Sequence, residues 1–167
     1  MITPIFLETM ALYNKWQNEN LFAICDELDD YQLHLSRGMF FDSILKTLNH
    51  IISVDEAIHS FIHTKNPPKL DLTFVPYPSY GELKSARSEF DENLVVESQV
   101  YLQNWLDEVF EFWSAKLNRN RKVPRSFYYV QMFNHQTHHR SQITTELHKM
   151  GIDYGNTDLP YNPYYEF

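Results

Sequence analysis

Three histidines lie within five residues in the stretch NHQTHHRSQ (134–142), and together they could bind a metal ion. His135 and His139 are four positions apart, with His138 between them. Since an α-helix turns about 100° per residue, positions i and i+4 project from nearly the same face. Two imidazoles on one face can bind a metal, or they can be core-edge histidines that hydrogen-bond to neighbouring helices. A third ligand from another element would favour the metal site.

His50 is the candidate for that third ligand. It lies in SILKTLNHIISVDEAIHSF (43–61), and the residues that share its helical face are mostly apolar or small. A histidine on such a face points toward the protein interior. His59 and His63 lie about 180° and 220° further round the same helix, so we expect them at the surface or at a loop edge and not as ligands.

The remaining histidines are weaker candidates. The same angular test directs His148 away from the site, and His34 lies in a polar connector. His138 lies about 60° to one side of His135, where it could flank the site, bond to a ligand or face a neighbouring helix. Its role stays open.

Four long segments with helical periodicity must position these side chains. They span Pro4 to Asp26, Met39 to His63, Tyr80 to Leu106 and Phe127 to Met150. Thr3 is the expected N-cap of the first segment, Ser126 the expected N-cap of the fourth, and Gly151 the expected C-cap of the fourth. In the third segment we expect Leu83, Ala86, Phe90, Leu94 and Leu102 to be the apolar anchors.

The segments between these helices indicate how they are connected. TKNPPKLDLTFVPYPSYGEL (64–83) contains four prolines, which cannot continue a helix, so it predicts a long crossover loop between the second and third helices. VFEFWSAKLNRNRKVPRS (109–126) predicts a short hairpin, and the aromatic tail IDYGNTDLPYNPYYEF (152–167) predicts an extended strap. We therefore expect an all-α four-helix bundle that forms a single domain over residues 1–167.

Composition excludes several classes of protein. The formal charge of -8 and the pI near 5.4 argue against nucleic acid as a partner, because such binding depends on Lys and Arg. Cys25 is the one cysteine, so the chain has no CxxC metal or redox pair, and we expect this residue to be a small core hydrophobe. No apolar run approaches the roughly 18 residues of a membrane span, and the N-terminal stretch lacks the apolar region of a secretory signal. These features predict a cytoplasmic protein without a membrane partner.

Several motifs resemble the DinB-like, or DNA-damage-inducible, family of metal-binding four-helix bundles. They are YNKWQNENL (13–21), LNHII (48–52) and HQTHHRSQITTELHKMG (135–151), and the helix order and long loop agree as well. The resemblance implies that His50, His135 and His139 are three metal ligands. It also implies a homodimer through an apolar surface of the first or third helix, with Trp105 and Trp113 near the end of the latter.

Three neutral imidazoles would leave a divalent ion with open positions, which is the pattern of catalytic sites. Imidazole suits zinc, nickel and iron, and the sequence does not rank them. Such an ion is a Lewis acid that lowers the pKa of a bound water or thiol. The wider superfamily that the motifs resemble includes thiol transferases that use bacillithiol, mycothiol or glutathione, and also isomerases and hydrolases.

We favour the activation of a low-molecular-weight thiol for transfer to a small electrophilic substrate. Because Cys25 has no evident catalytic partner in the sequence, the chain would have to import this thiol. The alternatives are a metal-dependent hydrolase, in which Gln142 or Glu146 orients a metal-bound water, and a non-catalytic metal-binding stress protein. The sequence leaves open whether the chain is an enzyme at all.

Overall fold

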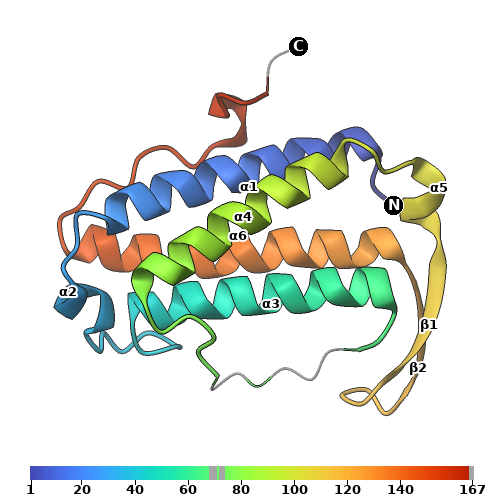
Figure 1. Cartoon of the computed structure of the whole chain (residues 1–167), viewed down its shortest axis with the longest axis horizontal. Coiled ribbons are helices and arrows are strands. Elements are labelled where there is room, and N and C mark those ends of the chain that lie inside the picture. The colour runs from blue at the N-terminus through green and yellow to red at the C-terminus, as the bar shows by residue number, and fades with distance from the viewer. Residues whose placement is uncertain (68–70, 72–73, 166–167) are drawn as a thin grey trace.

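Helices make up most of the computed structural model. The structure describes residues 1–67, 71 and 74–165. Four long helices lie side by side, and their bounds are α1 Pro4–Cys25, α3 Ile44–Thr64, α4 Tyr80–Ser98 and α6 Arg125–Lys149 (Figure 1). α1 packs along α4, and α3 packs along α6. The expectation of a mostly helical fold is confirmed. Within the described residues, no helix combines the length and the apolar character needed to cross a membrane.

The first helix begins as the sequence predicts. The Thr3 hydroxyl accepts a hydrogen bond from the backbone N–H of Phe6 at 3.1 Å, which caps α1. The connector after α1 contains a short helix that we did not predict, α2 (Asp30–His34). A capping box starts it, in which the side chains of Asp29 and Gln32 each accept a hydrogen bond from the other's backbone N–H.

The second long helix, α3, starts at Ile44 and not at Met39, so the predicted start is wrong. Ser43 caps it by accepting the Lys46 N–H at 3.3 Å. Asp42 has a φ of 72°, a left-handed conformation that no helix can continue through, and it forms an isolated bridge with Met39. Residues 35–43 therefore form a bend before the helix.

The third predicted helix is divided in two. α4 ends at Ser98, and a turn leads to the short helix α5 (Gln103–Asp107). The Ser98 hydroxyl donates to the Val95 carbonyl, which competes with the helical hydrogen bonds there. Leu83 and Leu94 are buried as predicted and Ala86 and Phe90 are half-buried, but Leu102 is 67% exposed because it lies in the turn, so its assignment as an anchor is wrong.

The predicted hairpin is confirmed by two antiparallel strands, β1 (Val109–Ser114) and β2 (Arg119–Pro124). β2 continues directly into α6, which therefore starts at Arg125 and not at Phe127. The Arg125 N–H donates to the Glu108 carbonyl at 2.9 Å, and its guanidinium donates to the carbonyls of Ile62 and Trp105. These bonds fix the first turn, so Ser126 is buried inside it and is not the N-cap.

The C-terminal end of α6 agrees with the prediction. Gly151 has a φ of 77°, a conformation that glycine adopts without strain. The N–H of Gly151 donates to the His148 carbonyl at 2.9 Å, and the N–H of Ile152 donates to the Leu147 carbonyl at 3.0 Å. These two hydrogen bonds form the Schellman motif, which ends the helix.

The chain must pass from one end of the molecule to the other between α3 and α4, because these two helices run in the same direction (Figure 1). Residues 68–70 and 72–73 of the predicted loop lie outside the described residues. Its last part is fixed to α3 by two hydrogen bonds of 2.9 Å between the Asn49 side chain and the Tyr77 backbone.

The described part of the tail packs against the bundle, as the sequence predicts, and the structure places it on α1. The Tyr13 hydroxyl donates to the Thr157 carbonyl at 2.7 Å, and the Gln17 side chain donates to the Asn156 carbonyl at 3.1 Å. The 3₁₀ turn η1 (Leu159–Tyr161) follows. Figure 1 shows the first part of the tail, after α6, running beside α1.

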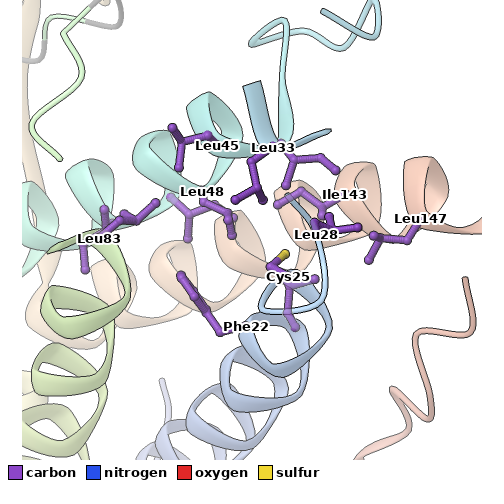
Figure 2. Packing of buried hydrophobic residues seen from close by; sticks show 13 residues of the cluster. Phe22, Cys25, Leu28, Leu33, Leu45, Leu48, Leu83, Ile143 and Leu147 are labelled. Atoms are coloured by element: carbon purple, nitrogen blue, oxygen red, sulfur yellow. The ribbon is translucent and has the colours of Figure 1, made fainter. Parts of the chain in front are cut away.

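Buried apolar residues form two clusters. Figure 2 shows one of them, where Phe22 and Cys25 of α1 meet Leu48 of α3 and Ile143 of α6. The other cluster includes Leu7, Ile62, Leu94, Tyr129 and Met132. Cys25 is fully buried, so its expected role as a small core residue is confirmed.

A group of buried polar side chains connects the four long helices. We call it the core polar network, and its members are Asn14, Asn18, Asp55, Arg87, Asp91, Gln136 and Arg140. Arg87 of α4 donates to Asp55 of α3 at 2.6 Å and makes two hydrogen bonds to Asp91, of 3.0 and 2.7 Å. Asn18 of α1 donates to Asp91 at 2.9 Å.

The second half of the network lies on α6. The Arg140 guanidinium donates to Gln136 at 2.7 Å and to Asn14 of α1 at 2.8 Å. Asn18 donates to Gln136 at 3.2 Å, which joins the two halves. The network contains two guanidinium groups and two carboxyl groups, so these buried charges can balance.

Replacing Arg87 with Met should lower the free energy of unfolding by about 3–5 kcal/mol, because two buried carboxyl groups would lose their charged partner. Chemical denaturation of the metal-free protein, followed by circular dichroism, measures this. The matched control is Lys84→Met on the same helix, which removes an exposed ion pair with Asp26 and should cost less than about 1 kcal/mol. Equal effects of the two changes would contradict the assigned role of the network.

Candidate metal centre

His50 of α3 meets His135 and His139 of α6, so the structure brings together the three histidines singled out in the sequence. The Nε2 atoms of His50 and His135 are 3.0 Å apart. The ring centroids are 4.9 Å apart for His50 and His135, 4.6 Å for His50 and His139, and 4.4 Å for His135 and His139. One ring nitrogen of each residue lies within 4.8 Å of the others.

Neighbouring side chains fix the orientation of these rings. Phe41, in the bend before α3, stacks on His50 with ring centroids 3.8 Å apart, and it contacts His139 edge-on at 5.5 Å. Gln142 Oε1 lies 2.8 Å from His139 Nδ1 and can accept a hydrogen bond from its N–H. This bond favours the tautomer in which the lone pair of His139 is on Nε2.

All three imidazoles favour the neutral form. Burial lowers the pKa of His50 to about 4, and the neighbouring His139 adds to the shift. Burial together with the three nearby histidines lowers the pKa of His135 to about 3. Burial also lowers the pKa of His139, although the bond to Gln142 acts in the opposite direction. At neutral pH each ring therefore keeps a nitrogen lone pair, which a metal ligand requires.

The geometry of the cluster is compatible with a divalent ion. Three nitrogens gather where only one pair, His50 and His135, lies at hydrogen-bond distance. His135 Nδ1 is buried and has no hydrogen-bond partner among the described residues. Ligand atoms on one tetrahedral zinc ion lie about 3.3 Å apart, close to the 3.0 Å separation seen here.

The other polar residues of α6 do not join the cluster. His138 is exposed, with its ring 4.7 Å from that of His139, and His148 is also exposed. Glu146 is buried and accepts a hydrogen bond from Lys149 at 2.7 Å. Gln142 bonds to a histidine, so the structure gives it an orienting role toward the ring, where the sequence suggested one toward water.

His59 and His63 lie on the opposite face of α3 from His50, partly exposed, as expected. However, the structure places both beside Glu97 of α4, and these three form a second group that could hold a metal ion. The exclusion of these two histidines as ligands considered only the angle around their own helix. Nothing in the sequence indicated Glu97 as a ligand, because its position beside the two histidines depends on how α4 packs against α3.

A small cavity lies next to Gln142. It has a volume of about 210 Å³ and is lined by Met39, Phe40, Gln142, Thr145 and Glu146. Another cavity, of about 420 Å³, lies between α1, α6 and the tail. No candidate histidine lines either cavity, but the smaller one is lined by Gln142, which bonds to His139. The smaller cavity is therefore the nearer space for a substrate.

Three side chains that help to position the site were not predicted from the sequence. Phe41 was placed inside a predicted helix, while Gln136 and Arg140 were not recognised as buried. A signal for the last two was present, because each directly follows a candidate ligand, His135 or His139. Residues one position further along face about 100° away, toward α1, where Asn14 and Asn18 bind them.

Comparison with known proteins gives one family. The sequence profile of the DinB family matches residues 1–166. No curated protein sequence matches the chain significantly.

Changing His50, His135 or His139 singly to Ala should remove about one equivalent of divalent metal per chain, because two imidazoles hold an ion much more weakly than three. Elemental analysis of protein purified and dialysed under one set of conditions measures this. His148→Ala, on the exposed side of the last turn of α6, is the matched control and should retain the metal. Equal metal content in all four variants would show that these three histidines do not form a metal site.

Proposed function

The chain belongs to the DinB family, and from this membership and the three-histidine cluster we propose a metal-dependent enzyme that transfers a small thiol to an electrophilic substrate. We also infer that the four long helices form a four-helix bundle with a crossover connection between α3 and α4. Both inferences rest on the family together with the helix packing described above.

His50, His135 and His139 are the residues that would hold the ion, which is zinc, nickel or iron. When bound by three neutral imidazoles, such an ion supplies Lewis acidity that lowers the pKa of a thiol or water. The chain's own residues contribute orientation. Phe41 fixes the plane of the His50 ring, and Gln142 fixes the tautomer of His139.

The observation that carries the proposal is the three-histidine cluster, and the state of Cys25 indicates where the thiol would come from. Its side chain is buried among apolar residues of α1, α3 and α6 (Figure 2), and burial raises the pKa of its thiol to about 12. Such a thiol is neither ionised nor accessible, so it cannot be the nucleophile. A thiol that reacts at the histidines must therefore come from solution.

The cavity beside Gln142 offers a place for the second reactant. Met39 and Phe40 give it an apolar wall, and Phe40 is 78% exposed at its edge. An apolar electrophile would bury surface there. Glu146 lines the same cavity with a carboxylate, and this group favours the alternative function, hydrolysis by water that Glu146 orients.

Turnover of an electrophilic substrate should require both a low-molecular-weight thiol and the metal. A panel of thiols and electrophiles, with esters and amides alongside, is assayed with metal-loaded and metal-stripped protein. Activity that depends on thiol and disappears on stripping is the expected result. Metal-dependent ester or amide cleavage without thiol would instead support the hydrolase.

Two variants sharpen this assay. Cys25→Ala should retain the thiol-dependent activity, because the nucleophile comes from solution. His135→Ala should lose it. Absence of turnover across the panel at full metal occupancy would contradict an enzymatic role and favour a non-catalytic metal-binding protein.

We further propose that the protein is a homodimer through exposed apolar side chains of α1 and α4. Ile5 and Phe6 on α1, and Val96 and Val100 near the end of α4, are exposed. The two helix ends are neighbours, because Gln99 donates to Glu8 at 3.2 Å. The tryptophans expected there lie elsewhere: Trp105 is in α5, where it stacks on Tyr101, and Trp113 is on β1.

Light scattering at micromolar concentration should give twice the monomer mass of 20.0 kDa. Val100→Glu should shift the mass to that of the monomer, because a charge on the contact would have to be desolvated. Leu117→Glu, at an exposed position of the hairpin turn, is the matched control and should leave the dimer intact. A monomer mass for the unmodified protein would refute the dimer.

A further inference from the structure

A second cluster of metal-ligating side chains lies where α3 and α4 both end. His59 Nε2 is 2.7 Å from Glu97 Oε2, and His63 Nε2 is 3.8 Å from the same oxygen. The two imidazole rings are 4.4 Å apart. A donor atom of each of the three residues lies within 4.8 Å of the others.

The composition and spacing of the cluster suit a divalent transition metal. Two imidazoles and one carboxylate are a common ligand set for zinc. Ligand atoms on a tetrahedral zinc ion are about 3.3 Å apart, and the two distances to Glu97 Oε2 fall on either side of that value. His59 and His63 are four residues apart on α3, so they project from one face.

The cluster is accessible without being fully solvated. The side chains of His59, His63 and Glu97 are 28%, 35% and 31% exposed. An ion can therefore enter, while the ligands remain restrained by their helices. The Tyr101 hydroxyl lies 2.9 Å from Glu97 Oε2 and 3.2 Å from His63 Nε2, so it can hold the carboxylate in place.

The C-terminal ends of α3 and α4 favour the binding of a cation. α3 and α4 run in the same direction, so the partial negative charges of their C-terminal carbonyls lie at the same end of the molecule. Glu97 in the last turn of α4 adds a full negative charge, and that turn has no basic residue. Two cations lie near this end, Lys65 at the end of α3 and Arg125, and both are bonded to the carboxylate of Glu108. The Glu97 carboxylate is therefore left to the two histidines and Tyr101, and a metal ion at the cluster would compensate its charge.

This cluster is separate from the three-histidine centre. His59 follows His50 by nine residues, which is about 13 Å along α3 and about half a turn around it. Two metals that act together in one reaction lie about 3.5–4 Å apart, so the two clusters cannot form one dinuclear centre.

We propose that His59, His63 and Glu97 form a second divalent-metal site, suited to zinc, which links the C-terminal ends of α3 and α4. The ion binds more tightly to the folded chain, in which the three ligands converge, than to the unfolded chain, so its binding stabilises the fold. Without an ion the same residues would be a hydrogen-bonded contact between the helices, and the test must separate these two cases.

Zinc binding is measured on the full chain in the double variant His135→Ala/His139→Ala, which lacks two ligands of the first centre. Calorimetry and elemental analysis should find about one equivalent, and zinc should raise the melting temperature. Adding His63→Ala or Glu97→Gln should abolish both the binding and the temperature shift. Glu97→Gln is informative because it retains the size and hydrogen-bonding capacity of the side chain while it removes the charge.

The same changes are made in the unmodified protein, in case the double variant does not fold. There His63→Ala and Glu97→Gln should each reduce the zinc content by about one equivalent, while His148→Ala should leave it unchanged. Circular dichroism verifies the fold of every variant. Zinc content and melting-temperature shift that do not respond to His63→Ala or Glu97→Gln would overturn the proposal and leave a hydrogen-bonded contact.

Discussion

The buried pairing of Arg87 with Asp55 and Asp91 is the interaction on which the rest of the structure depends. A guanidinium group excluded from water is tolerated only when its hydrogen bonds and its charge are satisfied by fixed partners. Here the partners come from α3 and α4, and Asn18 of α1 extends the pairing toward α6. Sliding or rotating one helix would leave a charged group unpaired, so the network defines one arrangement of the four.

The three-histidine cluster follows from that arrangement. Arg140 and Gln136 each come one position after a cluster histidine, and their bonds to α1 set the rotation of α6 about its axis. That rotation directs His135 and His139 toward α3. His50 is five residues before Asp55 on α3, so the same pairing that holds Asp55 also holds the register of His50. The cluster therefore takes its shape from the fold before any ion binds.

The two ends of the molecule differ in chemistry because of their surroundings. Around His50, burial and the neighbouring histidines keep the imidazoles neutral and available as ligands. Around His59, the carboxylate of Glu97 and the C-terminal ends of two helices supply negative charge. The first environment is suited to a strongly Lewis-acidic ion, whereas the second is suited to an ion whose charge is partly compensated.

The sequence by itself determined the features that depend on near neighbours in the chain. Periodicity located the long helices, Thr3 and Gly151 marked two of their ends, and the four-residue spacing of His135 and His139 placed them on one face. The tertiary structure alone decided where α3 begins, where α4 breaks and that β2 continues into α6. It also brought Phe41 to His50 and Glu97 to His59. These contacts join residues far apart in sequence, and they form only when packing and the buried charges have fixed the rotation and register of every helix together.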